Sequence, residues 1–148
     1  MKRNIITLLI TVFAMLQATA QPYDNLWKQA DIIAQKDQPK SEIGVMKKII
    51  SKAMVAKDYG QLLAAEVRQA ILWREISPDS LTPNVKRMET EALKAKDPVL
   101  KAVRYAVLGK VYRDMNEKKS EEFFKKALEQ PELLARNASS GYVPLTLK

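Results

Sequence analysis

Apolar side chains recur at spacings of three and four through most of this chain, which is the period of a helix with one buried face. The pattern predicts six helices, over residues 22–36, about 40–56, 59 to about 73, about 83–93, 98 to about 112, and 119–130. The short connections between them favour antiparallel neighbours. The predicted fold class is therefore all-α, with antiparallel helical hairpins arranged as a bundle or a short solenoid.

Residues with strong capping or turn chemistry mark the predicted boundaries. Asp58 suits the N-cap of the third helix. The stretch 77–80, Ser-Pro-Asp-Ser, predicts a loop, and Thr82-Pro83 predicts the N-cap and first residue of the fourth helix. Asp97-Pro98 repeats that start signal, whereas Pro131 is expected to end the last helix.

The last two predicted helices resemble a tetratricopeptide pair. The first has an aromatic residue, a Leu-Gly pair and a tyrosine, and the second has a small residue, an aromatic residue, an Ala-Leu pair and a proline. The small residues would let the helices approach closely, while the aromatic residues fill the groove between them. The turn is one residue short of the usual spacing, and the earlier helices do not carry the signature. The matching residues are Tyr105, Leu108, Gly109, Tyr112, Ser120, Phe124, Ala127, Leu128 and Pro131.

The first 20 residues are predicted to be a secretory signal peptide. Lys2 and Arg3 precede an apolar run over residues 5–16, and Ala18-Thr19-Ala20 supplies a small-residue cleavage site. The alternative is a membrane anchor, but the run is short for a span of about 20 residues. We therefore expect export to the periplasm or cell envelope, a helical domain over residues 21–136, and no stable membrane insertion after cleavage.

The C-terminal residues 137–148 are predicted to be extended. The stretch YVPLTLK, residues 142–148, alternates apolar and polar positions like a half-buried strand. A single strand leaves its backbone hydrogen bonds unpaired. This segment is therefore either the start of a following β domain or a tail that lies against the helices.

The charge of the chain does not predict nucleic-acid binding. The formal charge is +8, and removal of Lys2 and Arg3 with the signal peptide leaves +6 on residues 21–148. Basic residues are spread over every segment and interleaved with acids, which is typical of solvated helix faces. There is no cysteine, so disulfides and lipid attachment through cysteine are excluded.

The residues present give no pattern typical of an enzyme. Histidine is absent as well as cysteine, which removes the common nucleophile systems and most zinc sites. Glu89 and Glu91 lie two apart on a predicted helix and so face different ways. Trp27 and Trp73 could line a ligand groove, although core packing is the commoner fate of such residues. We predict no catalytic, cofactor-binding or metal-binding residue, no cofactor and no enzymatic activity.

Four stretches together resemble the amino-terminal region of Bacteroidetes alpha-2-macroglobulin-like proteins: QPYDNLWKQ at 21–29, SPDSL at 77–81, KDPVLKAVRYAVLGKVY at 96–112 and GYVPLTLK at 141–148. The resemblance implies a helical segment in front of macroglobulin-type β-sandwich domains. The bait region and thioester of that family have no counterpart here, so no site residue is carried over. The same resemblance suggests O-glycosylation at Ser80, within Asp-Ser-Leu.

The sequence therefore predicts a non-catalytic helical scaffold or interaction module of an exported alpha-2-macroglobulin-like protein. Its expected partner is another protein or neighbouring domains of the same polypeptide. One alternative is a free-standing periplasmic, tetratricopeptide-like binding protein for a protein partner or an acidic polymer. A second is a hydrolase that works with carboxylates alone.

Overall fold

The computed structural model describes residues 21–135, so the predicted signal peptide and the predicted extended tail lie outside the described residues. This part of the chain forms seven helices and no strand: α2 (Gln21–Ala34), α3 (Pro39–Ala56), α4 (Tyr59–Ile76), α5 (Pro78–Lys94), α6 (Pro98–Tyr112), α7 (Glu117–Ala127) and α8 (Pro131–Ala135). The all-α prediction is confirmed.

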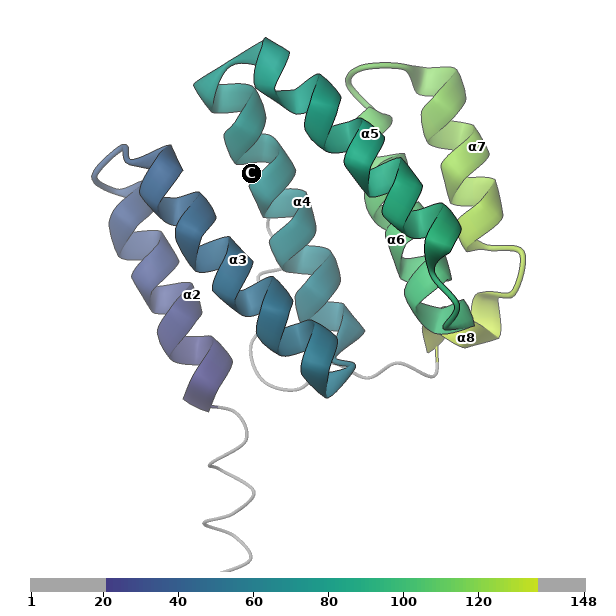
Figure 1. The fold of residues 1–148 in the computed structure, drawn as a ribbon, viewed down its shortest axis with the longest axis horizontal. Coiled ribbons are helices and arrows are strands. Elements are labelled where there is room, and N and C mark those ends of the chain that lie inside the picture. The colour runs from purple at the N-terminus through teal and green to yellow at the C-terminus, as the bar shows by residue number, and fades with distance from the viewer. Residues whose placement is uncertain (1–20, 136–148) are drawn as a thin grey trace, which may run out of the picture.

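The helices form a row of packed hairpins that runs from α2 to α7 (Figure 1). Each helix from α2 to α6 packs against its successor, and α4 also contacts α6. The short helix α8 packs on α6. One continuous apolar core joins α2 through α6, because buried residues of all five helices belong to the same cluster.

Helix α4 is the centre of this arrangement, since it packs against α3, α5 and α6. Because α4 is apolar over a wide arc, it can bury apolar surface against all three neighbours. Polar groups on α4 are buried with it: the side chain of Gln61 is fully buried, and its Oε1 accepts a hydrogen bond of 2.7 Å from Trp27 Nε1 of α2. This hydrogen bond satisfies the indole N–H inside the core.

Two predicted helix starts are confirmed by their caps. The side chain of Asp58 accepts a hydrogen bond from the backbone N–H of Gln61. Asp97 accepts from the backbone N–H groups of Val99, at 2.9 Å, and Leu100, at 3.2 Å. Each carboxylate thereby satisfies amides that have no partner inside the helix.

The predicted loop at 77–80 and the start at Thr82-Pro83 are wrong. Helix α5 begins at Pro78, with Ser77 as its N-cap, and Pro83 lies inside the helix. Proline at position 83 removes the N–H that would otherwise bond the Asp79 carbonyl one turn earlier. Asp79 is exposed, so water can reach this first turn, while Leu81 and Val85 gain burial in the core.

The last predicted helix is also corrected. Helix α7 begins at Glu117, two residues earlier than expected, because the Asn116 side chain caps it through the Lys119 amide at 3.0 Å. It ends at Ala127, and Pro131 starts α8 instead of ending α7. Proline fits the first turn of a helix as well as the position after one. The structure therefore has seven described helices where six were predicted.

Helices α6 and α7 meet at Gly109, as their small residues predicted. The Ser120 hydroxyl donates a 2.7 Å hydrogen bond to the Gly109 carbonyl. A Cβ atom at Gly109 would lie 2.8 Å from the Cγ and Cδ1 atoms of the Phe124 ring. The missing side chain is therefore what lets the two helices come this close. The tetratricopeptide resemblance itself stays a prediction.

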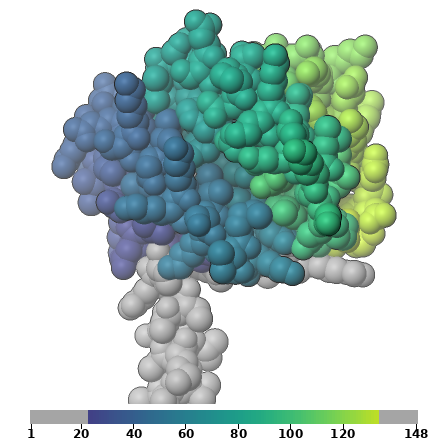
Figure 2. Space-filling view, in the orientation of Figure 1, coloured from purple at the N-terminus to yellow at the C-terminus, as the bar shows by residue number. Residues whose placement is uncertain are grey.

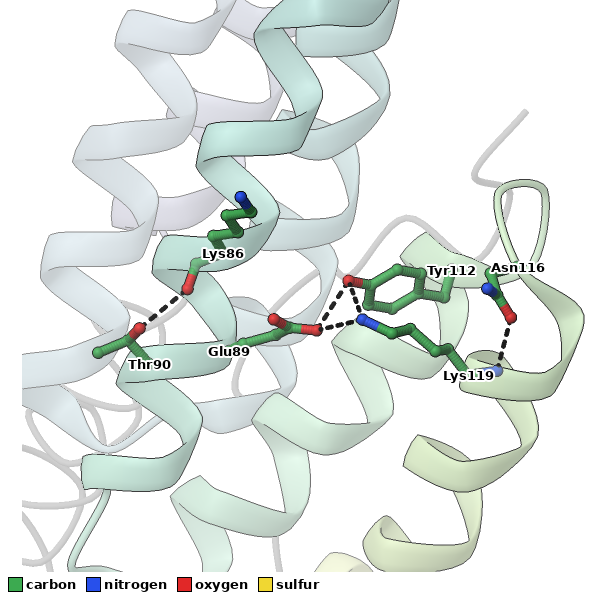
Figure 3. A network of polar contacts seen from close by, with 6 residues as sticks. All are labelled: Lys86, Glu89, Thr90, Tyr112, Asn116 and Lys119. Atoms are coloured by element: carbon green, nitrogen blue, oxygen red, sulfur yellow. Dashed lines mark hydrogen bonds and ion pairs between the residues drawn. The ribbon is translucent and has the colours of Figure 1, made fainter.

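A polar network joins the same hairpin to α5 (Figure 3). The Tyr112 hydroxyl donates to Glu89 Oε1 at 2.7 Å, and Lys119 Nζ lies 3.3 Å from the same oxygen. The Lys119 ammonium also lies 4.8 Å from the centre of the Tyr112 ring. The ring of Phe123 stacks on the Tyr112 ring as well. The hydroxyl, the ammonium and the carboxylate that meet at this junction of α5, α6 and α7 thus satisfy one another.

Within the part of the chain that the structure describes, no helix is both long enough and apolar enough to span a bilayer.

Candidate binding groove between α3 and α5

Besides a hollow of about 340 Å³ that Tyr105, Lys126 and Leu133 help to line, two hollows between helices are candidates for a binding site. The first, of about 130 Å³, lies between α4, α5 and α6, and its lining is mainly apolar. Two of its charged residues, Arg74 and Asp114, pair with each other at 2.8 Å. The second, of about 370 Å³, lies between α3, α4 and α5 and is lined by five polar or charged residues and two apolar ones. We call it the α3–α5 groove.

The floor of the α3–α5 groove is one face of α4. Leu62, Glu66, Gln69 and Trp73 follow one another at spacings of four, three and four, so they share this face. All four are buried. Figure 1 shows α4 between α3 and α5, and Figure 2 shows the atoms of these helices in the same orientation. The residues that line the groove are Lys47, Ile50, Ser51, Gln69, Trp73, Asn84 and Arg87.

One hydrogen-bond donor in this lining has no partner among residues 21–135. Gln69 is only 4% exposed, and its Nε2 atom makes no hydrogen bond to the described residues. Most buried polar groups in folded proteins are hydrogen-bonded, and leaving one unpaired costs about 1–3 kcal/mol. By contrast, Asn84 Nδ2 on the opposite wall donates to the Ser80 carbonyl at 2.8 Å. The groove therefore holds a donor that nothing in the described chain satisfies.

The two cations of the lining have different surroundings. Arg87 Nη1 lies 2.6 Å from Glu91 Oε1 on the same helix, and the guanidinium lies 5.6 Å from the centre of the Trp73 ring. Lys47 is exposed on α3 and forms no ion pair with any residue of the described chain. The groove is therefore positively charged on the α3 side and partly neutralised on the α5 side.

A buried carboxyl group lies beside the groove. Glu66 is 8% exposed, and its neighbours are Arg104 of α6 and Arg87 and Glu91 of α5. Burial raises the pKa of Glu66 to about 7, with Arg104 opposing the rise and Glu91 adding to it. The Arg104 Nε atom is itself buried without a partner among residues 21–135, although its Nη2 lies 3.4 Å from Glu91.

The outer surface of α3 continues the positive charge beyond the groove. Lys47, Lys48 and Lys52 line a shallow exposed surface together with Val55, which is 86% exposed. None of these lysines pairs with an acidic residue of the described chain, although Lys52 Nζ lies 5.8 Å from the centre of the Tyr23 ring. We call these four residues the α3 lysine face.

The structure separates the side chains that the sequence singled out. Trp27 packs in the core at 1% exposure, whereas Trp73 is buried and also lines the groove. Glu89 and Glu91 do face different partners: Glu89 contacts Tyr112 and Lys119, and Glu91 contacts Arg87 and Arg104. These carboxylates are not brought together.

Ser80, the candidate glycosylation residue, lies in the first turn of α5 and is half-buried, not in a loop. Its backbone carbonyl accepts the hydrogen bond from Asn84.

The sequence did not predict that Gln69, Lys47 and Arg87 line a common groove. The one available signal was Gln69 itself, a polar residue on the α4 face that also carries Leu62 and Trp73. Lysine and arginine on predicted helix surfaces are too common to single out a site. Their meeting in one groove depends on how α3 and α5 pack on α4.

In residues 21–135, no three His, Cys, Asp or Glu side chains lie close enough together to hold a metal ion. No family model, curated protein or solved structure matches this chain. The groove is therefore interpreted from the chemistry of its own residues.

Proposed function

We propose that this chain is a non-catalytic helical interaction module whose α3–α5 groove receives a segment of a partner protein or of a neighbouring domain. The observation that carries the proposal is the groove itself, about 370 Å³ in volume and lined by three helices. Its lining combines the apolar surfaces of Ile50 and Trp73 with polar groups, which is the usual composition of a recognition site. Grooves between helices commonly hold extended or helical peptide segments.

The proposed setting is the cell envelope, as part of an exported alpha-2-macroglobulin-like protein. The signal-peptide pattern of residues 1–20 and the four similar stretches support this setting. The absence of histidine and cysteine from the sequence supports a role without catalysis. An immunoblot of native envelopes with an antibody against residues 21–135 tests the setting. A band far above 16.8 kDa is expected, and a band at or below that mass would argue for a free-standing protein.

A photo-crosslinking experiment tests the groove. A benzoylphenylalanine replaces Ser51, which is exposed and lines the groove, or Ser41, which is exposed on α3 but lines none of the hollows described above. In native envelopes we expect a discrete adduct from position 51 and none from position 41. A synthetic peptide of the crosslinked segment should then bind the native protein and lose binding to the Ser51→Trp variant. Equal labelling from both positions would contradict the proposal.

The α3 lysine face supports a second candidate, a binding protein for an acidic polymer. Three lysines without acidic partners in the described chain surround the exposed Val55 on one helix. Attraction between such a surface and a polyanion weakens steeply with added salt. Binding of a polyanion that disappears on raising NaCl from about 0.05 to 0.3 M would favour this candidate over a shaped groove.

A further inference from the structure

We infer that the α3–α5 groove recognises a carboxylate, and that its occupant is an acidic protein segment. This inference rests on the proposed function and names the chemistry of the partner. It starts from Gln69, which lines the groove and whose buried Nε2 donor has no acceptor within the described chain. A ligand that completes this site must bring a hydrogen-bond acceptor to it.

The positive charges of the groove favour a negatively charged hydrogen-bond acceptor. Lys47 on the α3 wall has no acidic partner in the described chain, and Arg87 on the α5 wall uses one of its nitrogens for Glu91. An arginine side chain has five N–H donors, so others remain for a ligand. A carboxylate has two acceptor oxygens and a negative charge, and it can meet an amide donor and a cation at the same time.

The other residues of the lining favour a segment of a protein over a free small carboxylic acid. Ile50 and Trp73 offer apolar surface beside the donors, which suits the aliphatic part of a Glu or Asp side chain and its neighbours. The α3 lysine face shares Lys47 with the groove and extends the positive surface along α3. Further acidic residues of the same segment would lie over these lysines.

Residues 1–20 and 136–148 supply no acidic side chain for the groove. Neither residues 1–20 nor residues 136–148 contain an aspartate or a glutamate. The acidic segment therefore belongs to another domain or another protein.

Selection from a random library of twelve-residue peptides, displayed on phage and panned against the purified protein, tests the inference. Asn84→Trp, which narrows the groove from its α5 wall and lies outside the α3 lysine face, identifies peptides that bind there. We expect these peptides to be enriched in Asp and Glu. Their affinity should fall about tenfold when each acid is replaced by its amide, as expected for a charge-assisted hydrogen bond.

Three variants test which residues recognise the carboxylate. Gln69→Met keeps the shape of the buried side chain but removes the donor, and Lys47→Gln removes the cation. Each should weaken the selected acidic peptides about tenfold. Lys118→Gln, an exposed lysine on α7, is the matched control and should leave their affinity unchanged. Gln69→Met should remain folded, because the donor it removes has no partner in the described chain.

The other outcomes overturn the inference in distinguishable ways. Groove-dependent peptides that are neutral or basic would reject the carboxylate while leaving the proposed function intact. A selection without any peptide sensitive to Asn84→Trp would reject both the carboxylate and the proposed function. Acidic peptides that bind Gln69→Met as tightly as the native protein, and that heparin displaces, would assign the binding to a polyanion surface on the lysines.

Discussion

The α3–α5 groove and the α6–α7 hairpin both contain buried polar atoms, but these atoms differ in whether they have hydrogen-bond partners. At the hairpin, the Gly109 carbonyl, the Ser120 hydroxyl and the Tyr112 hydroxyl all have partners within 3.5 Å. In the groove, the Gln69 Nε2 donor is buried without one in the described chain. Buried polar groups stabilise a fold when they are satisfied and destabilise it when they are not. The hairpin therefore satisfies its own polar atoms, whereas the groove leaves one buried donor without a partner in the described chain.

The comparison extends to buried charge. Glu89 at the hairpin is met by Tyr112 and Lys119, while Glu66 beside the groove makes no hydrogen bond within residues 21–135 and lies among Arg87, Glu91 and Arg104. Removing the unsatisfied polar group of the groove should therefore raise the free energy of unfolding. Removing a satisfied polar group of the hairpin should lower it.

The largest expected effect is the pH dependence caused by Glu66. Its pKa is raised to about 7 in the folded protein from 4.5, so the folded state binds an extra proton between these values. Stability is therefore lost as pH rises through this window, by roughly 2–3 kcal/mol between pH 5 and pH 8. Glu66→Gln should remove that loss, as measured by urea unfolding at both pH values.

Glu75→Gln, an exposed glutamate on the same helix, is the control and should follow the native pH curve. If the Glu66→Gln and native proteins lose the same free energy of unfolding between pH 5 and pH 8, the charged group beside the groove is not a source of instability.

The next effect is steric and lies in the hairpin. Gly109→Val should lower the free energy of unfolding by about 2 kcal/mol, because its side chain would overlap the Phe124 ring. Gly44→Val lies on an exposed part of α3, where an added Cβ would meet no atom within 4 Å, and should change it by less than about 0.5 kcal/mol. Adding Phe124→Ala should relieve part of the Gly109→Val defect. Equal effects at the two glycines would show that the helices are not in close contact.

A smaller loss is expected when the hairpin network is cut. Tyr112→Phe removes the hydroxyl that donates to Glu89 and should cost about 1.5 kcal/mol, as for a hydrogen bond to a charged group. Tyr105→Phe, on the same helix and without a hydrogen bond from its hydroxyl to the described residues, should cost less than about 0.5 kcal/mol. Thermal unfolding of both variants measures the difference, and an equal cost would remove the distinction between the two tyrosines.

The smallest effect has the opposite sign and addresses the groove directly. Gln69→Met should raise the free energy of unfolding by about 1 kcal/mol, because it replaces an unsatisfied donor with an apolar group of similar shape. Gln61→Met, the same change two turns earlier on α4, should lower it by about 2 kcal/mol, since Trp27 Nε1 would lose its acceptor. Chemical unfolding of the two variants gives the comparison. A loss of stability in both would mean that Gln69 is satisfied inside the fold.

Much of the fold was accessible from the sequence, and the exceptions have a common cause. The caps at Asp58 and Asp97 were predicted because a cap acts on amides two or three residues away. The start of α5 was placed five residues too late, because Pro83 is a strong local start signal and the sequence does not show that the first turn before it is held by burial of Leu81. The end of α7 was misplaced for a similar reason, since Pro131 fits both the end of one helix and the start of the next.

The candidate site could not be predicted in the same way. Gln61 and Gln69 lie on the same helix, are both buried and look equivalent in the sequence. Gln61 is satisfied by Trp27, which is 34 residues away, whereas Gln69 faces a groove whose walls come from α3 and α5. The difference lies in the packing partners and not in the residues themselves.

By itself, the sequence determined the helical class, most helix boundaries and the close contact at Gly109. These features depend on spacings of three and four, on caps and on residue size, all of which act within or between adjacent helices. Only the tertiary structure decided which polar side chains are buried, which of them have partners, and where Lys47, Gln69 and Arg87 meet. Those outcomes depend on groups far apart in the chain that become neighbours once the helices have packed.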